Sequence, residues 1–410
     1  MAKELSYPKE KIKILLLEGL HPSSVETFNQ KGFTNITTSK NAMTEEELLD
    51  CIEDYHIIGI RSKTNITAPV LEKAKKLLAV GCFCIGTNQV DLKKATQLGI
   101  PVFNSPYSNT RSVAELIIAN SIMLLRGIPA RNKAAHEGTW LKDAINSYEL
   151  RGKTIGIIGY GHIGSQVSVL AEAVGLNVLF YDVEPKLTLG NAKATNSLDE
   201  LLANSDIVTL HVPATPQTAN MIGADEFAKM KDGVIFQNLA RGNVVDIAAL
   251  KNAYESGKVV GAAVDVFPQE PEKKGTGFVS ELQGLDNVIL TPHIGGSTQE
   301  AQENIGRDVA LKLTSFIDNG STIGCKTVPE LSLPLQENTR RILHVHENVP
   351  GILSQINSIL SQHQVNILGQ YLKTNETIGY VVLDVDANAD NEVVQDVKNI
   401  PHTINARILY

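Results

Sequence analysis

The chain has 410 residues, of which 43% are hydrophobic and 20% charged, and its formal net charge is −8 at pH 7. This length predicts two or three globular domains, and the negative charge argues against a general binder of nucleic acid or anionic membranes. The apolar run at residues 14–17 is too short for a signal peptide or a membrane span. The four cysteines show neither metal-ligand nor disulfide spacing, so we expect a cytoplasmic protein without a metal site.

Strands and helices alternate through the first hundred residues. Four apolar stretches are predicted strands: residues 11–17, 56–61, 76–80 and 101–104. Cys82 and Cys84 continue the third stretch and are expected to be buried strand residues without a redox role. Helices are predicted at residues 23–31 and from Thr44, where Thr-Glu-Glu-Glu has capping-box chemistry. This order predicts a parallel sheet with helices on both faces.

A helix over residues 109–125 is apolar nearly all round, so we expect it to be buried. Further on, an apolar strand runs directly into Gly159-Tyr-Gly161-His-Ile-Gly164 and a second helix. The first glycine of such a loop permits a tight turn, the second lets a pyrophosphate approach the backbone, and the third lets helix and strand pack closely. A plain strand-turn-helix connection is the alternative, but the flanking strand and helix favour dinucleotide binding.

Asp182 ends the next predicted strand, which covers residues 177–182. Its carboxylate would accept hydrogen bonds from the adenosine ribose and repel a 2′-phosphate. NAD is therefore favoured over NADP.

Three polar side chains follow later strands, which are predicted at residues 207–210, 234–236, 259–264 and 288–290. Arg241, Glu270 and His293 follow the last three, at the sheet edge where open α/β folds bind ligands. Arg241 could bind a carboxylate with its guanidinium fork, while His293 transfers a proton and Glu270 orients the imidazole and stabilises its charged form. Taken singly, they could be surface charges and a capping or core histidine. Their placement at consecutive strand ends favours carbonyl reduction.

A helix predicted at residues 299–317 follows Gly295 and Gly296, which could be a hinge or a simple turn pair. If this helix packs on the first sheet, the first domain is discontinuous. Residues 329–339 are expected to be a linker. The tail has the order βαββαβ of a ferredoxin-like sandwich and lacks the features of an RNA-binding surface. The predicted domains are residues 1–109 with 297–332, 110–296, and 338–410.

These motifs resemble those of the D-isomer-specific 2-hydroxyacid dehydrogenase family. The resemblance implies an α/β fold of two Rossmann-like, doubly wound domains, the first flavodoxin-like, with an ACT-type regulatory tail. It implies that Arg241 binds the substrate carboxylate and that Glu270 and His293 form the proton-donor pair. It also implies NAD contacts by Gly159, Gly161, His162, Ile163, Gly164, Asp182, Leu239, Ala240, Arg241, Asp265, His293, Ile294, Gly295 and Gly296.

Within the family, the resemblance implies NAD-dependent oxidation of 3-phospho-D-glycerate to 3-phosphohydroxypyruvate, a step of serine synthesis. Arg61 and Lys63 are expected to bind the phosphate, with Asn109 and Arg111 adding to the site. Lys63 stands where the family usually has an arginine, so the positive charge is kept but the bidentate geometry of a guanidinium group is lost. Alternatively, Arg61 and Lys63 end a solvated strand or bind a second carboxylate, as in 2-oxoglutarate reduction, and Asn109 caps its helix.

The tail resemblance implies that His346, Asn348 and Asn366 bind L-serine across a subunit interface of a homotetramer. The alternative is that His346 and Asn348 only cap a turn. Residues 336–339 replace a Gly-Gly pair of similar chains, which leaves the hinge-based transmission of inhibition open. Trp140 could lie at a subunit contact or be buried within one chain. A different class of function is an NAD-sensing, corepressor-like binding protein on the same scaffold.

Overall fold

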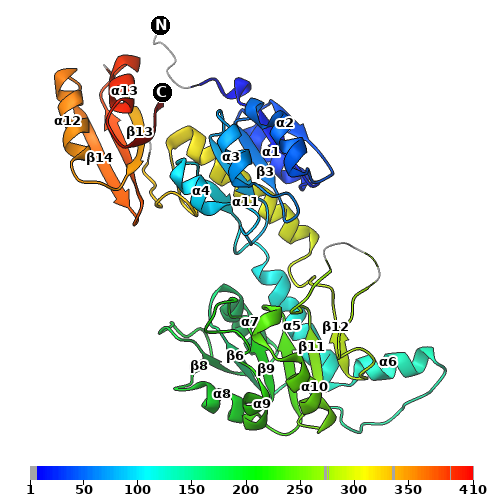
Figure 1. The fold of residues 1–410 in the computed structure, drawn as a ribbon. Coiled ribbons are helices and arrows are strands. Elements are labelled where there is room, and N and C mark those ends of the chain that lie inside the picture. The colour runs from blue at the N-terminus through cyan, green and yellow to red at the C-terminus, as the bar shows by residue number, and fades with distance from the viewer. Residues whose placement is uncertain (1–6, 272–274, 276, 335–337, 388, 410) are drawn as a thin grey trace. The chain divides into compact units, whose positions relative to one another are not determined.

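The computed structural model describes residues 7–271, 275, 277–334, 338–387 and 389–409, which form two compact units. The first unit comprises residues 1–108 and 302–410, and the second comprises residues 109–301 (Figure 1). The segment before residue 7 and residues 335–337 of the predicted linker lie outside the described residues.

The first unit contains a five-stranded parallel sheet of order β2-β1-β3-β4-β5. Its strands are β1 (Ile14–Leu16), β2 (Ile36–Thr38), β3 (Ile57–Ile60), β4 (Ala79–Cys82) and β5 (Val102–Asn104). Its helices are α1 (Pro22–Gln30), α2 (Glu45–Cys51), α3 (Ala68–Lys73) and α4 (Leu92–Gln97), with 3-10 turns at Lys9–Lys11 and Ile52–Asp54. The expected capping box is present, because Glu47 N donates to Thr44 Oγ1 and Thr44 N donates to Glu47 Oε2.

Helix α11 (Gln299–Asn319) returns to this sheet after the second unit. Val309 and Leu313 fill the space above Gly81 of β4, where an added Cβ would lie within 3 Å of both side chains. Chain segments far apart in sequence therefore build one hydrophobic core.

Strand β4 begins three residues later than predicted. Residues 75–77 form a turn, in which Leu77 N donates to Ala74 O, and pairing starts only after it. Cys82 is a buried strand residue as expected, but Cys84 lies beyond the strand and is partly exposed. Burial raises the pKa of both thiols, which keeps them protonated and unreactive.

The second unit is built on a seven-stranded parallel sheet of order β12-β11-β10-β9-β6-β7-β8. Its strands are β6 (Thr154–Ile158), β7 (Asn177–Tyr181), β8 (Lys193–Ala194), β9 (Ile207–Leu210), β10 (Val234–Asn238), β11 (Val259–Val264) and β12 (Val288–Leu290). Its helices are α5 (Thr110–Leu125), α6 (Ile128–His136), α7 (His162–Ala173), α8 (Leu198–Asn204), α9 (Ala224–Lys229) and α10 (Ile247–Glu255), with a 3-10 turn at Gly242–Val244. The strand order reverses at β6, which confirms the doubly wound fold.

Helix α5 is largely buried, as its apolar sequence predicts. Gln237 of β10 donates to Ile117 O and to Ser121 Oγ of this helix. Trp140 lies after α6 and is 83% exposed, so the alternative of burial within one unit is wrong. Among the described residues no single helix is long and apolar enough to cross a membrane, and α5 with α6 satisfies that test only as a pair bent by 67°.

The tail is an antiparallel sheet of order β14-β15-β13-β16, which confirms the predicted βαββαβ module. Its elements are β13 (Arg340–Glu347), α12 (Ile352–Gln362), β14 (Ile367–Thr374), β15 (Ile378–Val385), α13 (Asn391–Lys398) and β16 (Thr403–Leu409). Successive strand residues point to opposite faces. Ile342 accordingly packs with helices α12 and α13, whereas its neighbour Leu343 packs into the core of the first sheet.

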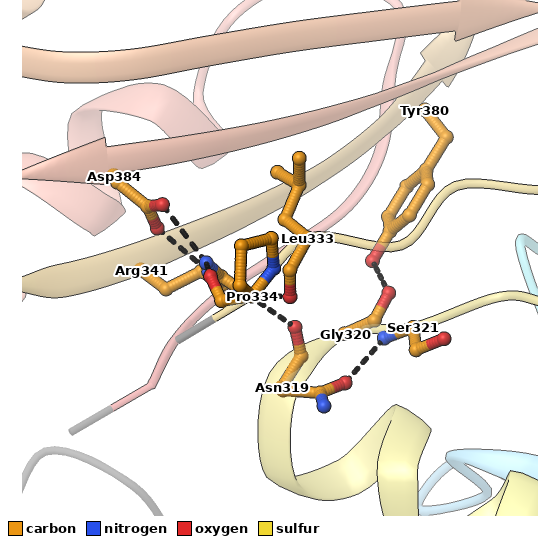
Figure 2. Close-up of polar contacts among 8 residues, drawn as sticks. All are labelled: Asn319, Gly320, Ser321, Leu333, Pro334, Arg341, Tyr380 and Asp384. Atoms are coloured by element: carbon orange, nitrogen blue, oxygen red, sulfur yellow. Dashed lines mark hydrogen bonds and ion pairs between the residues drawn. The ribbon is translucent and has the colours of Figure 1, made fainter. Parts of the chain in front are cut away.

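A buried ion pair within the tail involves an arginine that also contacts the end of α11 (Figure 2). Arg341 Nε lies 2.6 Å from Asp384 Oδ1, and both side chains are at most 2% exposed. The same guanidinium donates to three backbone carbonyls outside the module, those of Asn319, Leu333 and Pro334. Tyr380 Oη donates to Gly320 O nearby. Hydrogen bonds from Arg341 and Tyr380 thus join the tail to the end of α11 and to the segment that follows it.

Candidate active site

The glycine loop after β6 has the geometry that its sequence predicts. Gly159 has φ +92°, and a Cβ there would lie 2.7 Å from His211 O. A Cβ on Gly164 would collide with Gly159 O, whereas a Cβ on Gly161 would meet nothing within 4 Å. The first and third glycines are therefore required by the fold, and the second faces open space at the start of α7.

We expect alanine substitutions to separate these two roles. Gly164→Ala should lower the free energy of unfolding by about 1–3 kcal/mol, because backbone atoms must move. Gly161→Ala should leave the melting temperature unchanged but raise the KM for NAD, since its methyl group enters the space of the pyrophosphate. Thermal unfolding and NAD titrations measure both effects, and normal NAD affinity in Gly161→Ala would contradict this assignment.

Asp182 follows β7 and supports the glycine loop. Its Oδ2 accepts a hydrogen bond of 2.8 Å from Tyr160 N, and its Oδ1 accepts one of 3.0 Å from Glu184 N. The carboxylate remains partly exposed beside the loop, where it can also accept bonds from a ribose. Burial lowers the pKa of the neighbouring His211 to about 3, so this imidazole is neutral.

Three neighbouring strands end at the same level of the sheet. Asn238 of β10 pairs with Val264 of β11, which pairs with Leu290 of β12. The loops that follow carry Arg241, Glu270 and His293 respectively. The structure therefore brings the three predicted catalytic side chains to one edge of one sheet.

Glu270 and His293 form a hydrogen-bonded pair. His293 Nδ1 lies 2.8 Å from Glu270 Oε2, and Glu270 Oε1 accepts a bond from Phe267 N. Because a carboxylate can only accept, Nδ1 carries the proton and Nε2 is the nitrogen that can exchange a proton with a ligand. The His293 side chain is 52% exposed, so a ligand can reach it.

The backbone at His293 has φ +54°, a region that non-glycine residues rarely adopt. Asp265 stabilises this turn, since its oxygens accept bonds from Thr291 Oγ1, Ile294 N and Gly295 N. Asp265 is 1% exposed, so its carboxylate acts on the turn and presents little surface to a cofactor. The assignment of Asp265 as a cofactor contact stays a prediction.

Arg241 is held by the buried side chain of Asn238. Asn238 Oδ1 accepts from Ala240 N, and its Nδ2 donates to Arg241 O. A Cβ on Gly242 would collide with the backbone of Phe267, so the Arg241 and Glu270 loops touch at that glycine. The Arg241 residue is exposed after the strand end, and its Nη1 donates a hydrogen bond of 2.7 Å to Ala240 O.

Gly295 and Gly296 allow close packing in the second unit. Neither has a left-handed φ; a Cβ on Gly295 would lie 2.9 Å from Asp265 Oδ2, and one on Gly296 would collide with Asn109 Nδ2. Ser112 and Thr298 are hydrogen-bonded nearby. Close packing therefore explains both glycines, and a hinge here stays a prediction.

The expected phosphate ligands lie on both units. Arg61 and Lys63 follow β3 of the first unit, and Asn109 and Arg111 open α5 of the second. Arg111 is paired with Glu115 on the helix surface. Asn109 occupies the N-cap position of α5, but its side chain makes no cap bond, so the capping alternative is wrong.

In the tail, the three expected effector residues do not meet within one chain. His346 pairs with Gly379 at one end of β15, whereas Asn366 lies beside Asp386 at the other end, roughly 20 Å away along the strand. Asn348 Nδ2 donates to Asn375 O, as the turn-capping alternative predicts. His346 Nε2 is buried without a partner in the described part of the chain.

Comparison with known proteins decides the family. Residues 118–295 match the D-isomer specific 2-hydroxyacid dehydrogenase, NAD binding domain, and residues 342–405 match the AHAS small subunit-like ACT domain. The chain is 53% identical over 410 residues to the D-3-phosphoglycerate dehydrogenase of Haemophilus influenzae and 54% identical over 412 residues to that of Escherichia coli K12. Each match covers 100% of both chains. This chain belongs to the D-3-phosphoglycerate dehydrogenases, a group of the D-isomer specific 2-hydroxyacid dehydrogenase family.

A solved structure agrees with this family membership. The D-lactate dehydrogenase of Aquifex aeolicus, complexed with NAD and lactic acid, aligns with a TM-score of 0.64 and 28% identity over 78% of this chain and 100% of its own. The chain is therefore an NAD-dependent oxidoreductase, which confirms the cofactor and enzyme class expected from the sequence. The open space at Gly161 and the partly exposed Asp182 carboxylate fit NAD.

The roles of two polar side chains, buried Asn238 and partly buried Thr291, could not be assigned from the sequence. Asn238 orders the Arg241 loop, and Thr291 donates to Asp265 under the His293 turn. Both stand within motifs already singled out, next to an arginine and a histidine. The sequence signal that could have indicated these roles is a polar residue at the end of an apolar strand.

Proposed function

We propose that this chain oxidises 3-phospho-D-glycerate to 3-phosphohydroxypyruvate with NAD, the first step of the phosphorylated route to L-serine. The observation that carries the proposal is the Glu270–His293 pair at the same sheet edge as Arg241, in a chain whose full-length relatives carry that enzyme name. A further activity on the same residues is the reduction of 2-oxoglutarate to 2-hydroxyglutarate. We place the protein in the cytoplasm.

The chemistry follows from the side chains at the strand ends. Arg241 binds the substrate carboxylate through its guanidinium fork and orients C2. His293 Nε2 accepts the proton of the 2-hydroxyl group, and the Glu270 carboxylate stabilises the resulting imidazolium through Nδ1. NAD, when bound, accepts the hydride from C2. In the reverse direction His293 returns the proton to the carbonyl oxygen.

The phosphate distinguishes this substrate from lactate. Arg61 and Lys63 provide two positive charges for it, with Asn109 and Arg111 as further ligands. Lys63 keeps the charge of an arginine without its fork, so its grip on the phosphate is less directional. Arg111 must leave Glu115 to take part.

The test is NADH absorbance with a panel of 2-oxo acids. We expect rapid NADH consumption with 3-phosphohydroxypyruvate and slower consumption with 2-oxoglutarate. The opposing hypothesis, an NAD-sensing binding protein, predicts NADH binding without turnover. Absence of turnover with any 2-oxo acid would therefore overturn the enzymatic proposal.

For the tail we propose that L-serine is the effector and that the protein is a homotetramer. Since His346 and Asn348 lie at the opposite end of β15 from Asn366, one tail cannot supply all three to one small ligand. Two tails side by side can bring His346 and Asn348 of one to Asn366 of the other. This requirement supports a subunit interface at the effector site.

Serine inhibition provides the corresponding prediction. L-Serine should inhibit the unaltered enzyme, and Asn348→Ala and Asn366→Ala should each raise the serine concentration for half inhibition by about tenfold, the value of one lost hydrogen bond to a charged ligand. Gln364→Ala, on the loop before Asn366, is the control. Inhibition that persists unchanged in both asparagine variants would remove these residues from the effector site.

A further inference from the structure

We infer that Glu18, which no part of the sequence reasoning assigned, is the positioning residue of the Arg61–Lys63 phosphate-binding loop. The inference deepens the proposed function and rests on it. Glu18 does not touch the substrate in this scheme. It acts through the backbone of the loop that carries both cationic side chains.

The contact is made by three hydrogen bonds to one carboxylate. Glu18 Oε1 accepts bonds from Arg61 N at 3.1 Å and Thr64 N at 2.9 Å, and Oε2 accepts one from Lys63 N at 3.1 Å. These are charge-assisted bonds, which are roughly twice as strong as neutral ones. Through these bonds Glu18 binds the backbone N–H groups of both Arg61 and Lys63, the two proposed phosphate ligands.

The loop is also held from its other side. Gln89 is 5% exposed and its Nε2 donates to Arg61 O at 2.5 Å. Thr64 is fully buried and its Oγ1 accepts a bond from Met43 N. The backbone from Arg61 to Thr64 is therefore fixed, while the side chains of Arg61 and Lys63 remain accessible.

The backbone at Glu18 itself is unusual. Its φ is +66°, a conformation that costs a non-glycine residue about 1 kcal/mol or more and persists where surrounding contacts impose it. Glu18 N donates to Asn41 O, and Gly19 N donates to Ser39 O. Two backbone hydrogen bonds to the segment after β2 therefore hold the turn after β1. This turn directs the carboxylate toward the loop after β3.

The arrangement also decides which groups bind the phosphate. A cluster of backbone N–H groups in a turn is a common anion site. Here a protein carboxylate already occupies the N–H groups of Arg61, Lys63 and Thr64, so these three N–H groups are not available to a phosphate, and the guanidinium and ammonium groups supply the positive charge that binds it. Recognition of the phosphate then depends on how Glu18 sets the directions of those two side chains.

The experiment compares two substrates that differ only in the phosphate: 3-phosphohydroxypyruvate and hydroxypyruvate, each with NADH. In Glu18→Gln the amide oxygen can still accept from Arg61 and Thr64, but the amide NH₂ faces Lys63 N and cannot accept its bond. We expect kcat/KM for 3-phosphohydroxypyruvate to fall about tenfold through KM, the effect of one lost charge-assisted bond. Hydroxypyruvate turnover, kcat and the KM for NADH should not change.

Two further variants make the test specific. Glu18→Asp keeps the charge on a shorter side chain and should restore part of the preference for the phosphorylated substrate. Glu47→Gln is the matched control, because Glu47 also accepts a backbone N–H bond in the same unit, at the start of α2. It should leave the ratio of the two kcat/KM values unchanged.

The outcomes separate the two proposals. Absence of 3-phosphohydroxypyruvate turnover in the unaltered enzyme overturns the proposed function. Normal turnover there, with an unchanged substrate ratio in both Glu18 variants, overturns only the role of Glu18. Equal losses on both substrates, or a failure of Glu18→Gln to fold together with an unchanged ratio in Glu18→Asp, would show a purely structural residue and likewise overturn the inference.

Discussion

Replacement of His293 by alanine should lower kcat for 3-phosphohydroxypyruvate reduction by about 10²–10⁴-fold, the usual contribution of a positioned acid or base. The reason is that His293 Nε2 is the proton-exchanging atom of the site, because Glu270 is hydrogen-bonded to the other ring nitrogen, Nδ1. KM should change little, because Arg241 and the phosphate ligands still bind the substrate. Steady-state NADH absorbance measures both constants.

A matched control exists in the tail. His363 Nε2 lies 2.6 Å from Asp396 Oδ2, a similar histidine–carboxylate pair outside the second unit. His363→Ala should retain full activity. A His293→Ala enzyme with a kcat within threefold of the unaltered enzyme would exclude His293 as the acid and base.

The second large effect concerns the buried pair Arg341–Asp384. Removal of either partner, as in Arg341→Met or Asp384→Leu, should lower the free energy of unfolding by about 3–5 kcal/mol, because the remaining charge stays buried without its counter-ion. The double variant replaces both charges with apolar groups and should recover most of this loss. Urea unfolding of the four proteins completes the double-mutant cycle.

Recovery in the double variant should be incomplete, since the bonds from Arg341 to the carbonyls of Asn319, Leu333 and Pro334 are lost as well. Arg307→Met, which breaks an exposed pair with Glu303, is the control and should change stability little. Single variants as stable as this control would mean that water reaches the Arg341 site.

Strand positions were predictable where apolar runs have clear limits. Strands β9, β11 and β12 match the predicted ranges residue by residue. Strands β2 and β8 lie at the sheet edges, and their residues are exposed or partly exposed. Their sequences therefore lack the apolar pattern from which a strand can be predicted. Strand β10 extends to Gln237 and Asn238, which are fully buried because their hydrogen-bond partners come from α5 and the Arg241 loop.

The candidate site shows the same division. The meeting of Arg241, Glu270 and His293 follows from strand order in a parallel sheet, which the sequence reveals. The roles of Glu18 and Asp265 could not be predicted, because each depends on backbone N–H groups that a distant turn presents. Such bonds leave no periodic pattern in the residues that accept them.

The packing of Val309 and Leu313 over Gly81 also sets an order of events on the ribosome. Residues 109–301 are complete before either side chain is made, so the nucleotide-binding unit can fold first. Meanwhile the first sheet has emerged without the helix that covers one of its faces. Once residue 301 has left the ribosome while the rest of α11 is still inside it, the chain should hold a folded nucleotide-binding unit and an unfinished sheet, and the sheet is the part a chaperone would need to protect.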